Sequence, residues 1–172
     1  MTPLNIKANN VFLRPLSDED AVTLFSYRSK PEVAKFQLWK PVKIADAISF
    51  INKAKFQTEL INHQWNQFAI CLDINKKMVG DIGLLLNDHK AEIGFTINPL
   101  FQRKGFAFDA VTGLINYLFD KHIVDMIVAY TDPENAPSIM LLKKIGFCLD
   151  RSNSRNAEET TDYCFILNKD FE

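Results

Sequence analysis

The segment Gln102-Arg103-Lys104-Gly105 has the composition of a phosphate-binding turn. It lies between a predicted strand at residues 91–98 and a predicted helix at about residues 106–121. The first amides of a helix have no partners within the helix and bear a partial positive charge. The glycine permits close approach of a ligand to the backbone, and the two cations add charge. These features favour a phosphate site at the helix start, although a glycine here can also serve only the turn.

The predicted strand at residues 91–98 has two different faces. Side chains alternate along a strand, so Glu92, Gly94, Thr96 and Asn98 share one face. The other face is apolar and consists of Ala91, Ile93, Phe95 and Ile97. A small and polar face suits the wall of a cleft.

The elements that position these residues follow from hydrophobic periodicity. Strands are predicted at residues 11–13, 66–73, 77–86, 91–98, 124–130, 147–150 and 162–167. The first helix is predicted to follow a capping box at residues 17–20, and further helices are predicted at 43–60, 106–121 and 136–145. The order β-α-α-β-β-β-α-β-α-β-β predicts a mixed α/β (α+β) fold with about seven strands and four helices. We expect one domain over residues 1–172, with its core at about 11–170. The strands at 91–98 and 124–130 should be parallel and joined by a right-handed crossover.

Composition restricts the class of protein. The chain has 172 residues, a net charge of −1 and 47% hydrophobic residues, which disfavours a protein that coats nucleic acid or an anionic membrane. No segment resembles a signal peptide or a membrane span. The cysteines lack metal-site or redox spacing, so Cys71, Cys148 and Cys164 are interpreted as small core residues in a cytoplasmic protein. The three histidines are expected at the surface and no metal site is expected.

Two motifs resemble those of the GCN5-related N-acetyltransferase (GNAT) family. Residues 102–107, QRKGFA, match its Q/R-x-x-G-x-G/A signature, and residues 135–147 match its N-x-x-S/A element followed by G-F. The segments LRPLSDED and AEIGF are typical of the branch that contains the ribosomal-protein N-terminal acetyltransferases (RimJ/RimL-like). The resemblance extends from about residue 11 to the end of the chain.

The resemblance implies a GNAT fold with a central, mostly antiparallel sheet. It also implies an enzyme that uses acetyl-CoA as cosubstrate. The pyrophosphate of acetyl-CoA would bind the loop, and the pantetheine arm would bind strand 91–98 like an added strand. The residues implied to bind acetyl-CoA are Phe95, Thr96, Ile97, Gln102, Arg103, Lys104, Gly105, Phe106, Ala107 and Asn135. Asn135 is alternatively a simple helix cap.

Acetyl transfer requires removal of a proton from the amine and protonation of the leaving thiolate. Glu92 is the candidate base, with Asp81 as a weaker one, and a solvent-facing strand residue is the alternative. The family's usual acid is a tyrosine at the position of Leu142, so the chain departs from the pattern. The resemblance implies Ser138 as the substitute acid, although it could instead cap the helix, and Tyr130 is another candidate.

The acceptor is expected to be a primary amine, first a protein N-terminal α-amine. The alternatives are a small amine, such as an antibiotic, a polyamine or an amino-acid derivative, or a silent acyl-CoA-binding module. Phe36, Trp39 and Trp65 either line the acceptor pocket or pack as core or lid. The polar residues 151–161 are expected to form a mobile loop near the acceptor entrance, and the protein to be a monomer or homodimer.

Overall fold

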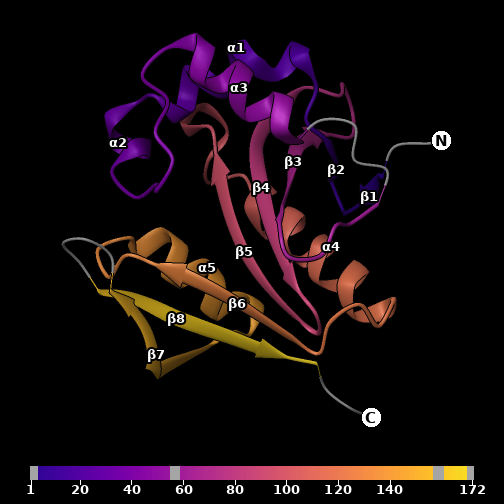
Figure 1. Ribbon diagram of the computed structural model, residues 1–172, viewed down its shortest axis with the longest axis vertical. Helices are drawn as coiled ribbons and strands as arrows, with labels where there is room; N and C mark the ends of the chain where they lie inside the picture. The colour runs from indigo at the N-terminus through magenta and orange to yellow at the C-terminus, as the bar shows by residue number, and fades with distance from the viewer. Residues whose placement is uncertain (1–3, 55–58, 157–160, 170–172) are drawn as a thin grey trace.

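The computed structural model describes residues 4–54, 59–156 and 161–169, which form one mixed sheet with helices on both faces (Figure 1). The strands are β1 (Ile6–Lys7), β2 (Val11–Pro15), β3 (Trp65–Leu72), β4 (Met78–Asn87), β5 (Lys90–Ile97), β6 (Met126–Thr131), β7 (Cys148–Asn156) and β8 (Thr161–Asn168). Their order across the sheet is β1-β2-β3-β4-β5-β6-β8-β7. Neighbours are antiparallel except β5 and β6, so the predicted fold class and the predicted parallel pair are confirmed.

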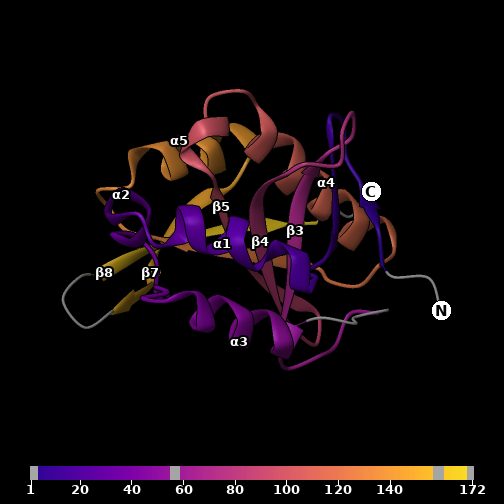
Figure 2. The same ribbon diagram turned by 90° about the horizontal axis from the view of Figure 1, so that it is seen from above.

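Two helices cover each face of the sheet (Figure 2). The helices are α1 (Ala21–Arg28), α2 (Pro31–Ala34), α3 (Ile44–Ala54), α4 (Phe106–Asp120) and α5 (Ala136–Ile145), with short 3-10 turns at Asp18–Asp20 and Pro99–Phe101. The helices α1 and α3 lie over one face of β3 and β4, whereas α4 and α5 lie on the opposite side. No helix in the described part of the chain has both the length and the apolar composition to cross a bilayer.

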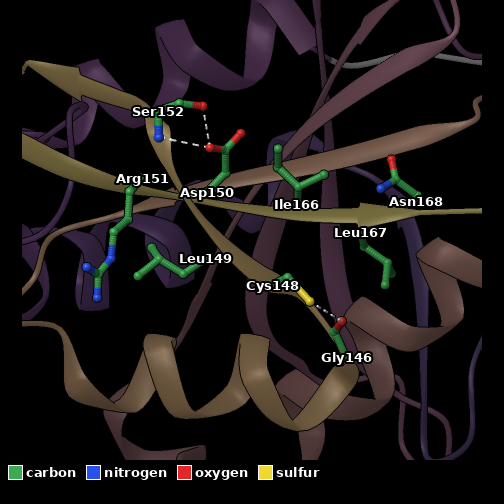
Figure 3. Close-up of a pocket in the computed structure, with 9 residues that line it drawn as sticks. All are labelled: Gly146, Cys148, Leu149, Asp150, Arg151, Ser152, Ile166, Leu167 and Asn168. Carbon is green, nitrogen blue, oxygen red and sulfur yellow. Dashed lines mark hydrogen bonds between the residues drawn. The ribbon is translucent and has the colours of Figure 1, made fainter.

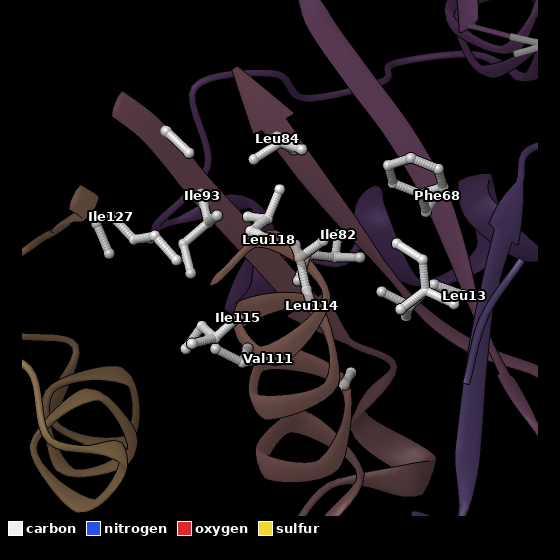
Figure 4. Close-up of a cluster of buried hydrophobic side chains, with 14 of the residues drawn as sticks. Leu13, Phe68, Ile82, Leu84, Ile93, Val111, Leu114, Ile115, Leu118 and Ile127 are labelled. Carbon is white, nitrogen blue, oxygen red and sulfur yellow. The ribbon is translucent and has the colours of Figure 1, made fainter. Parts of the chain in front are cut away.

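The larger hydrophobic core lies between α4 and the sheet (Figure 4). Leu114 and Leu118 on α4 are fully buried and pack with Ile82 of β4 and Ile93 of β5. A smaller cluster on the other face joins Leu24 and Tyr27 of α1, Ala47 and Ile51 of α3, and Ala69 and Cys71 of β3. The sheet is therefore held from both sides, and this fixes the positions of the cleft-facing strands.

The strands β5 and β6 pair over only part of their length. Their register consists of Lys90 with Met126, Ala91 with Ile127, and Glu92 with Val128. Figure 1 shows the two strands close together near the start of β6 and farther apart towards its end. By contrast, β5 pairs with β4 over its whole length. The backbone edge of β5 beyond Glu92 is therefore not paired with β6.

Several element boundaries differ from those predicted. The helix predicted at residues 43–60 is α3, which is described from Ile44 to Ala54. Residues 55–58 lie outside the described residues, and Glu59 and Leu60 are not helical. The short helix α2 was not predicted; it begins at Pro31, a position that proline tolerates. The two-residue strand β1 was not predicted.

The C-terminal hairpin also corrects two expectations. The polar residues from Arg151 to Asn156 continue β7: its pairing with β8 is irregular after Asp150 and resumes at Arg155 and Asn156. Residues 157–160 lie outside the described part. Cys148 is exposed at the start of this edge strand, whereas Cys71 and Cys164 are buried as expected. The histidines are at the surface, as predicted.

Candidate active site

One cavity, of about 430 Å³, brings together both predicted catalytic residues and two of the ten residues predicted to bind acetyl-CoA. Glu92 and Phe95 reach it from β5, and Asn135 and Ser138 reach it from the start of α5. The three aromatic residues predicted as either pocket or packing, Phe36, Trp39 and Trp65, also line it, as does Tyr130. The predicted residues Thr96, Ile97 and 102–107 do not line it.

A larger cavity, of about 700 Å³, lies between β7 and β8 and contains none of these residues (Figure 3). Its carboxylate, Asp150, accepts hydrogen bonds from the backbone and hydroxyl of Ser152, at 2.9 and 2.6 Å, and from Asn153 at 2.7 Å. These local bonds hold the pKa of Asp150 below its ordinary value. The cavity beside β5 is the better candidate because it holds groups that can move protons at the diverging strands.

The floor of the β5 cavity is a face of three adjacent strands. Cross-strand partners lie on the same face, so Gln67 of β3, Gly83 of β4 and Gly94 of β5 form one row. The next row consists of Trp65, Leu85 and Glu92, and the row on the other side of Gln67 consists of Ala69, Asp81 and Thr96. The middle row has two glycines side by side, which leaves the centre of the floor low.

Asp81, the weaker candidate base, does not line the cavity. It is fully buried and accepts hydrogen bonds from the Tyr27 hydroxyl, at 2.5 Å, and from the guanidinium of Arg28. Burial raises the pKa of Tyr27 well above its ordinary value, and the negative charge of Asp81 raises it further. Burial acts to lower the pKa of Arg28, but Asp81 more than offsets this and the pKa is raised. Asp81 is therefore the anionic half of a structural ion pair.

The same Arg28 supports one wall of the cavity. Its Nη1 donates to Oε1 of Gln37 at 2.6 Å, and its guanidinium lies 5.8 Å from the ring centroid of Trp39. Trp39 stacks in turn on Phe50 of α3, with centroids 4.2 Å apart. All of these residues line the cavity, so a buried ion pair fixes the aromatic wall opposite the sheet.

An exposed ion pair joins two walls of the cavity. Nζ of Lys35, just after α2, lies 2.8 Å from Oε2 of Glu134, which precedes α5. Lys35 and the neighbours of Glu134, Asp132 and Asn135, line the cavity. The α2 region and the start of α5 are therefore held together across its mouth.

The predicted phosphate loop has the backbone that its glycine suggested. Gly105 precedes α4 with φ +85°, in the left-handed region, and Arg103 also has a positive φ, of 62°. Residues 102–105 are exposed, so their amides and cations are accessible to a ligand. From Glu92 to Ile97, β5 extends about 17 Å at about 3.3 Å per residue. The loop lies beyond Ile97, so this length of strand separates it from Glu92 and suits a long, extended cosubstrate.

The open edge of β5 presents alternate residues. Asn98 donates its N–H to Val79 of β4 at 2.9 Å, so Ile97 and Phe95 direct their backbone groups to the opposite edge. Nε2 of Gln102 donates to the carbonyl of Ile97 at 3.1 Å. Thr96, between them, directs its backbone groups to β4. Phe95 and Ile97 are therefore the better-placed of the three predicted backbone partners.

The start of α5 separates the roles of Asn135 and Ser138. The side-chain oxygen of Asn135 accepts the backbone N–H of Ser138 at 3.4 Å, so Asn135 is the helix cap. Ser138 is the third helical residue, and its hydroxyl makes no hydrogen bond within the described part of the chain. Leu142, where the family's tyrosine would stand, is fully buried.

Buried hydroxyls give a further indication of a missing ligand. Thr131, which lines the cavity on β6, is 5% exposed, and its Oγ1 has no hydrogen-bond partner among the described residues. The hydroxyl of Thr96 on β5 is also buried without a partner. Buried polar groups are usually paired, so a ligand in the cavity would satisfy Thr131, whereas Thr96 lies outside the cavity lining. The loop, the open edge of β5 and the Thr131 hydroxyl fit acetyl-CoA.

Sequence reasoning missed Arg28, Gln67 and Gly83. No local pattern indicated these residues, because their place in the cavity depends on which strands pair and in which register. Gly94 was placed on the cleft face by alternation alone. The one feature of the sequence that could have indicated a role for Arg28 is its place in a short predicted helix, directly after the apolar-face residue Tyr27.

Comparison with known proteins agrees with this geometry. The family model of the acetyltransferase (GNAT) domain matches residues 10–148. The uncharacterized N-acetyltransferase p20 of Bacillus licheniformis is 34% identical over 143 residues, which cover 78% of this chain and 77% of that protein. These two matches identify the family from sequence.

Solved structures share the fold. An acetyltransferase of the GNAT family from Bacillus anthracis superposes with a TM-score of 0.81 at 25% identity, covering 96% of this chain and 98% of that one. RimL, a ribosomal L7/L12 α-N-protein acetyltransferase in complex with coenzyme A, superposes with a TM-score of 0.79 at 13% identity and the same coverage. The chain therefore belongs to the GNAT family of acetyltransferases and transfers the acetyl group of acetyl-CoA to an amine.

Proposed function

We propose that the protein acetylates the N-terminal α-amine of a peptide or protein by direct transfer from acetyl-CoA. The observation that supports this most is the shared cavity of Glu92 and Ser138, which come from β5 and from the start of α5. One group can receive the amine proton while the other donates a proton to the departing thiolate. RimL, which has the same fold, is described as an α-N-protein acetyltransferase, so its acceptor is a protein α-amine.

The residues divide between binding and proton transfer. The amides at the start of α4 and the side chains of Arg103 and Lys104 bind the pyrophosphate, and Phe95 and Ile97 bond the pantetheine through the open edge of β5. Asn135 caps α5 by accepting the backbone N–H of Ser138, and this contact fixes the position of Ser138. The amine nitrogen attacks the thioester carbonyl and Glu92 receives the amine proton, directly or through a water. The Ser138 hydroxyl passes its proton to the departing thiolate and regains one from solvent, and Glu92 releases its proton to solvent.

An α-amine makes modest demands on such a base. With a pKa near 8, roughly a tenth of it is neutral at pH 7, whereas less than about a thousandth of a lysine amine is neutral. A half-exposed carboxylate such as Glu92 can therefore suffice. A small amine is the second candidate, because a cavity of about 430 Å³ lies in the range of small-molecule sites.

The test is release of free CoA from acetyl-CoA in the presence of a panel of amines. The panel contains tripeptides with free N-termini, the same peptides N-terminally blocked but with a lysine, polyamines, and amino-acid amides. Acetylation of free N-termini with little on blocked lysine peptides is expected. Turnover confined to polyamines or free amino-acid derivatives would replace the proposal with the small-amine function.

Replacement of Glu92 tests the proton acceptor. Glu92→Gln should lower kcat at pH 7 by about 10²–10⁴-fold, as is typical for loss of a general base. Above pH 9 the α-amine is already neutral, so part of the loss should be recovered. A variant with the full rate at pH 7 would remove Glu92 from the mechanism.

A further inference from the structure

Gln67 is an unused polar group in the floor of the cavity. It lies on β3 opposite Gly83, is half-buried, and lines the cavity. A Cβ built on Gly83 would stand only 2.8 Å from its Oε1 and 3.0 Å from its Nε2, so the carboxamide lies directly over Gly83. The side chain makes no hydrogen bond within the described residues. A donor and an acceptor therefore lie together on the floor without partners.

Beside this amide the floor is empty. A Cβ built on Gly94, the partner of Gly83 on β5, would meet nothing within 4 Å. A glycine in the interior of a strand weakens the strand, and it often marks a place where a ligand approaches the backbone closely. Space over Gly94 is therefore useful only to a group that comes from outside the chain. The opposite aromatic wall is already fixed by Arg28 and Trp39.

The distances suit a peptide. Glu92 stands two residues from Gly94 on the same strand and face, and the Gln67 amide lies one strand away, about 4.8 Å. In a peptide the first carbonyl and N–H follow the α-amine after a single carbon. An amine beside Glu92 would thus place its first peptide group over Gly94 and Gly83, within reach of Gln67.

We propose that the carboxamide of Gln67 binds the backbone of the acceptor's second residue, with Oε1 accepting its N–H, which belongs to the first peptide bond, and Nε2 donating to the carbonyl of the same residue. The proposal rests on the N-terminal acetylation proposed above and names its recognition group. An extended residue presents its N–H and its C=O on the same side and so matches the carboxamide, whereas a polyamine has no carbonyl to offer. Gln67 therefore selects amines that are followed by a peptide bond.

The test is a double-mutant cycle on protein and substrate. A tripeptide is compared with its analogue in which the first peptide bond is an ester, which deletes the N–H. Wild type and Gln67→Met are assayed for kcat/KM, with Gln64→Met, on the exposed turn before β3, as the matched control. The cycle cancels the different basicity of the two amines, because both proteins meet the same pair of substrates.

We expect wild type and Gln64→Met to prefer the amide by about three- to tenfold, the range of one neutral hydrogen bond. Gln67→Met should lose this preference, and the affinity for CoA should not change. An undiminished preference in Gln67→Met would overturn the role of Gln67 and leave N-terminal acetylation intact. The opposite failure, with no acetylation of peptides, would refute the proposed function.

Binding gives a second readout that does not need turnover. Trp39 and Trp65 both line the cavity, so their fluorescence in the CoA complex reports peptide affinity. If wild type binds the amide more tightly than the ester and Gln67→Met binds both equally, the inference is supported even without acetylation. Equal affinities for both substrates in wild type would overturn it.

Discussion

The guanidinium of Arg28 on α1 and the carboxylate of Asp81 on β4 form a buried ion pair beneath the wall of the candidate active-site cavity. The two side chains are 10% and 0% exposed. The remaining guanidinium nitrogen reaches Gln37 and the group lies beside Trp39, so one pair connects the sheet, α1 and the chain after α2. Stability and the shape of the proposed acceptor site thus depend on the same contact.

Breaking this ion pair should destabilise the protein strongly. Asp81→Asn leaves the charge of Arg28 buried without compensation, which costs about 3–5 kcal/mol in the free energy of unfolding. Urea unfolding followed by circular dichroism measures this. The control is Asp73→Asn, which breaks the exposed pair with Lys76 and should leave stability nearly unchanged. A small effect of Asp81→Asn would mean that the pair does not hold α1 on the sheet.

A milder change should affect the wall without unfolding the chain. Arg28→Lys keeps the charge but cannot bond Asp81 and Gln37 together as the planar guanidinium does. We expect acrylamide to quench Trp39 more readily in this variant, measured in a Trp65→Phe background, while CoA affinity is retained. Unchanged quenching would show that Phe50 alone holds Trp39.

The phosphate loop should tolerate no reversal of its charge. Arg103→Glu places a carboxylate beside the start of α4, where the pyrophosphate is proposed to bind, so CoA affinity measured by calorimetry should fall at least tenfold. Lys121→Glu makes the same charge change at the other end of α4 and should leave CoA affinity unchanged. Equal affinities in all three proteins would place the pyrophosphate elsewhere.

The loop and the cavity floor differ in how far the sequence predicts them. Gly105 and its neighbouring cations are contiguous, and their effect depends on a local helix start, so a pattern of six residues revealed them. The row of Gln67, Gly83 and Gly94 is spread over three strands. Its composition is decided by strand register, which a one-residue shift would move to the opposite face.

The same distinction explains the other differences. Periodicity predicted the helices and strands because burial of one face is a local property of the sequence. It could not predict that Asp81 would face Arg28, since that contact joins residues 53 positions apart. It also treated Cys148 as a core residue, because an apolar neighbourhood does not reveal that its strand lies at the sheet edge.

Asp20 should make stability depend on pH in the acid range. Burial alone would raise its pKa, but hydrogen bonds from Arg14, at 2.7 and 2.8 Å, and from the N–H of Ser17 lower it below 3.8. The folded state then binds fewer protons than the unfolded state, so this stabilisation is complete above the unfolded pKa and is lost as the pH falls through the folded one.

The measurement is the thermal midpoint of wild type and Asp20→Asn between pH 6 and pH 2. Asp20→Asn should be less stable at pH 6, and the difference between the two proteins should shrink as the pH falls below about 4. Other carboxylates titrate in both proteins and cancel in the difference. A difference that stays constant with pH would show that Asp20 acts only as an uncharged hydrogen-bond acceptor.

The thiols should react in two classes. Cys148 is exposed, whereas Cys71 and Cys164 are buried, and burial raises the pKa of the Cys71 thiol and so lowers its thiolate fraction. A thiol reagent should therefore modify about one cysteine per native chain quickly and all three only after denaturation. Cys148→Ser should remove the fast phase. A second fast thiol in this variant would indicate that the packing over Cys71, which includes α1 and α3, or the packing over Cys164 opens in the native protein.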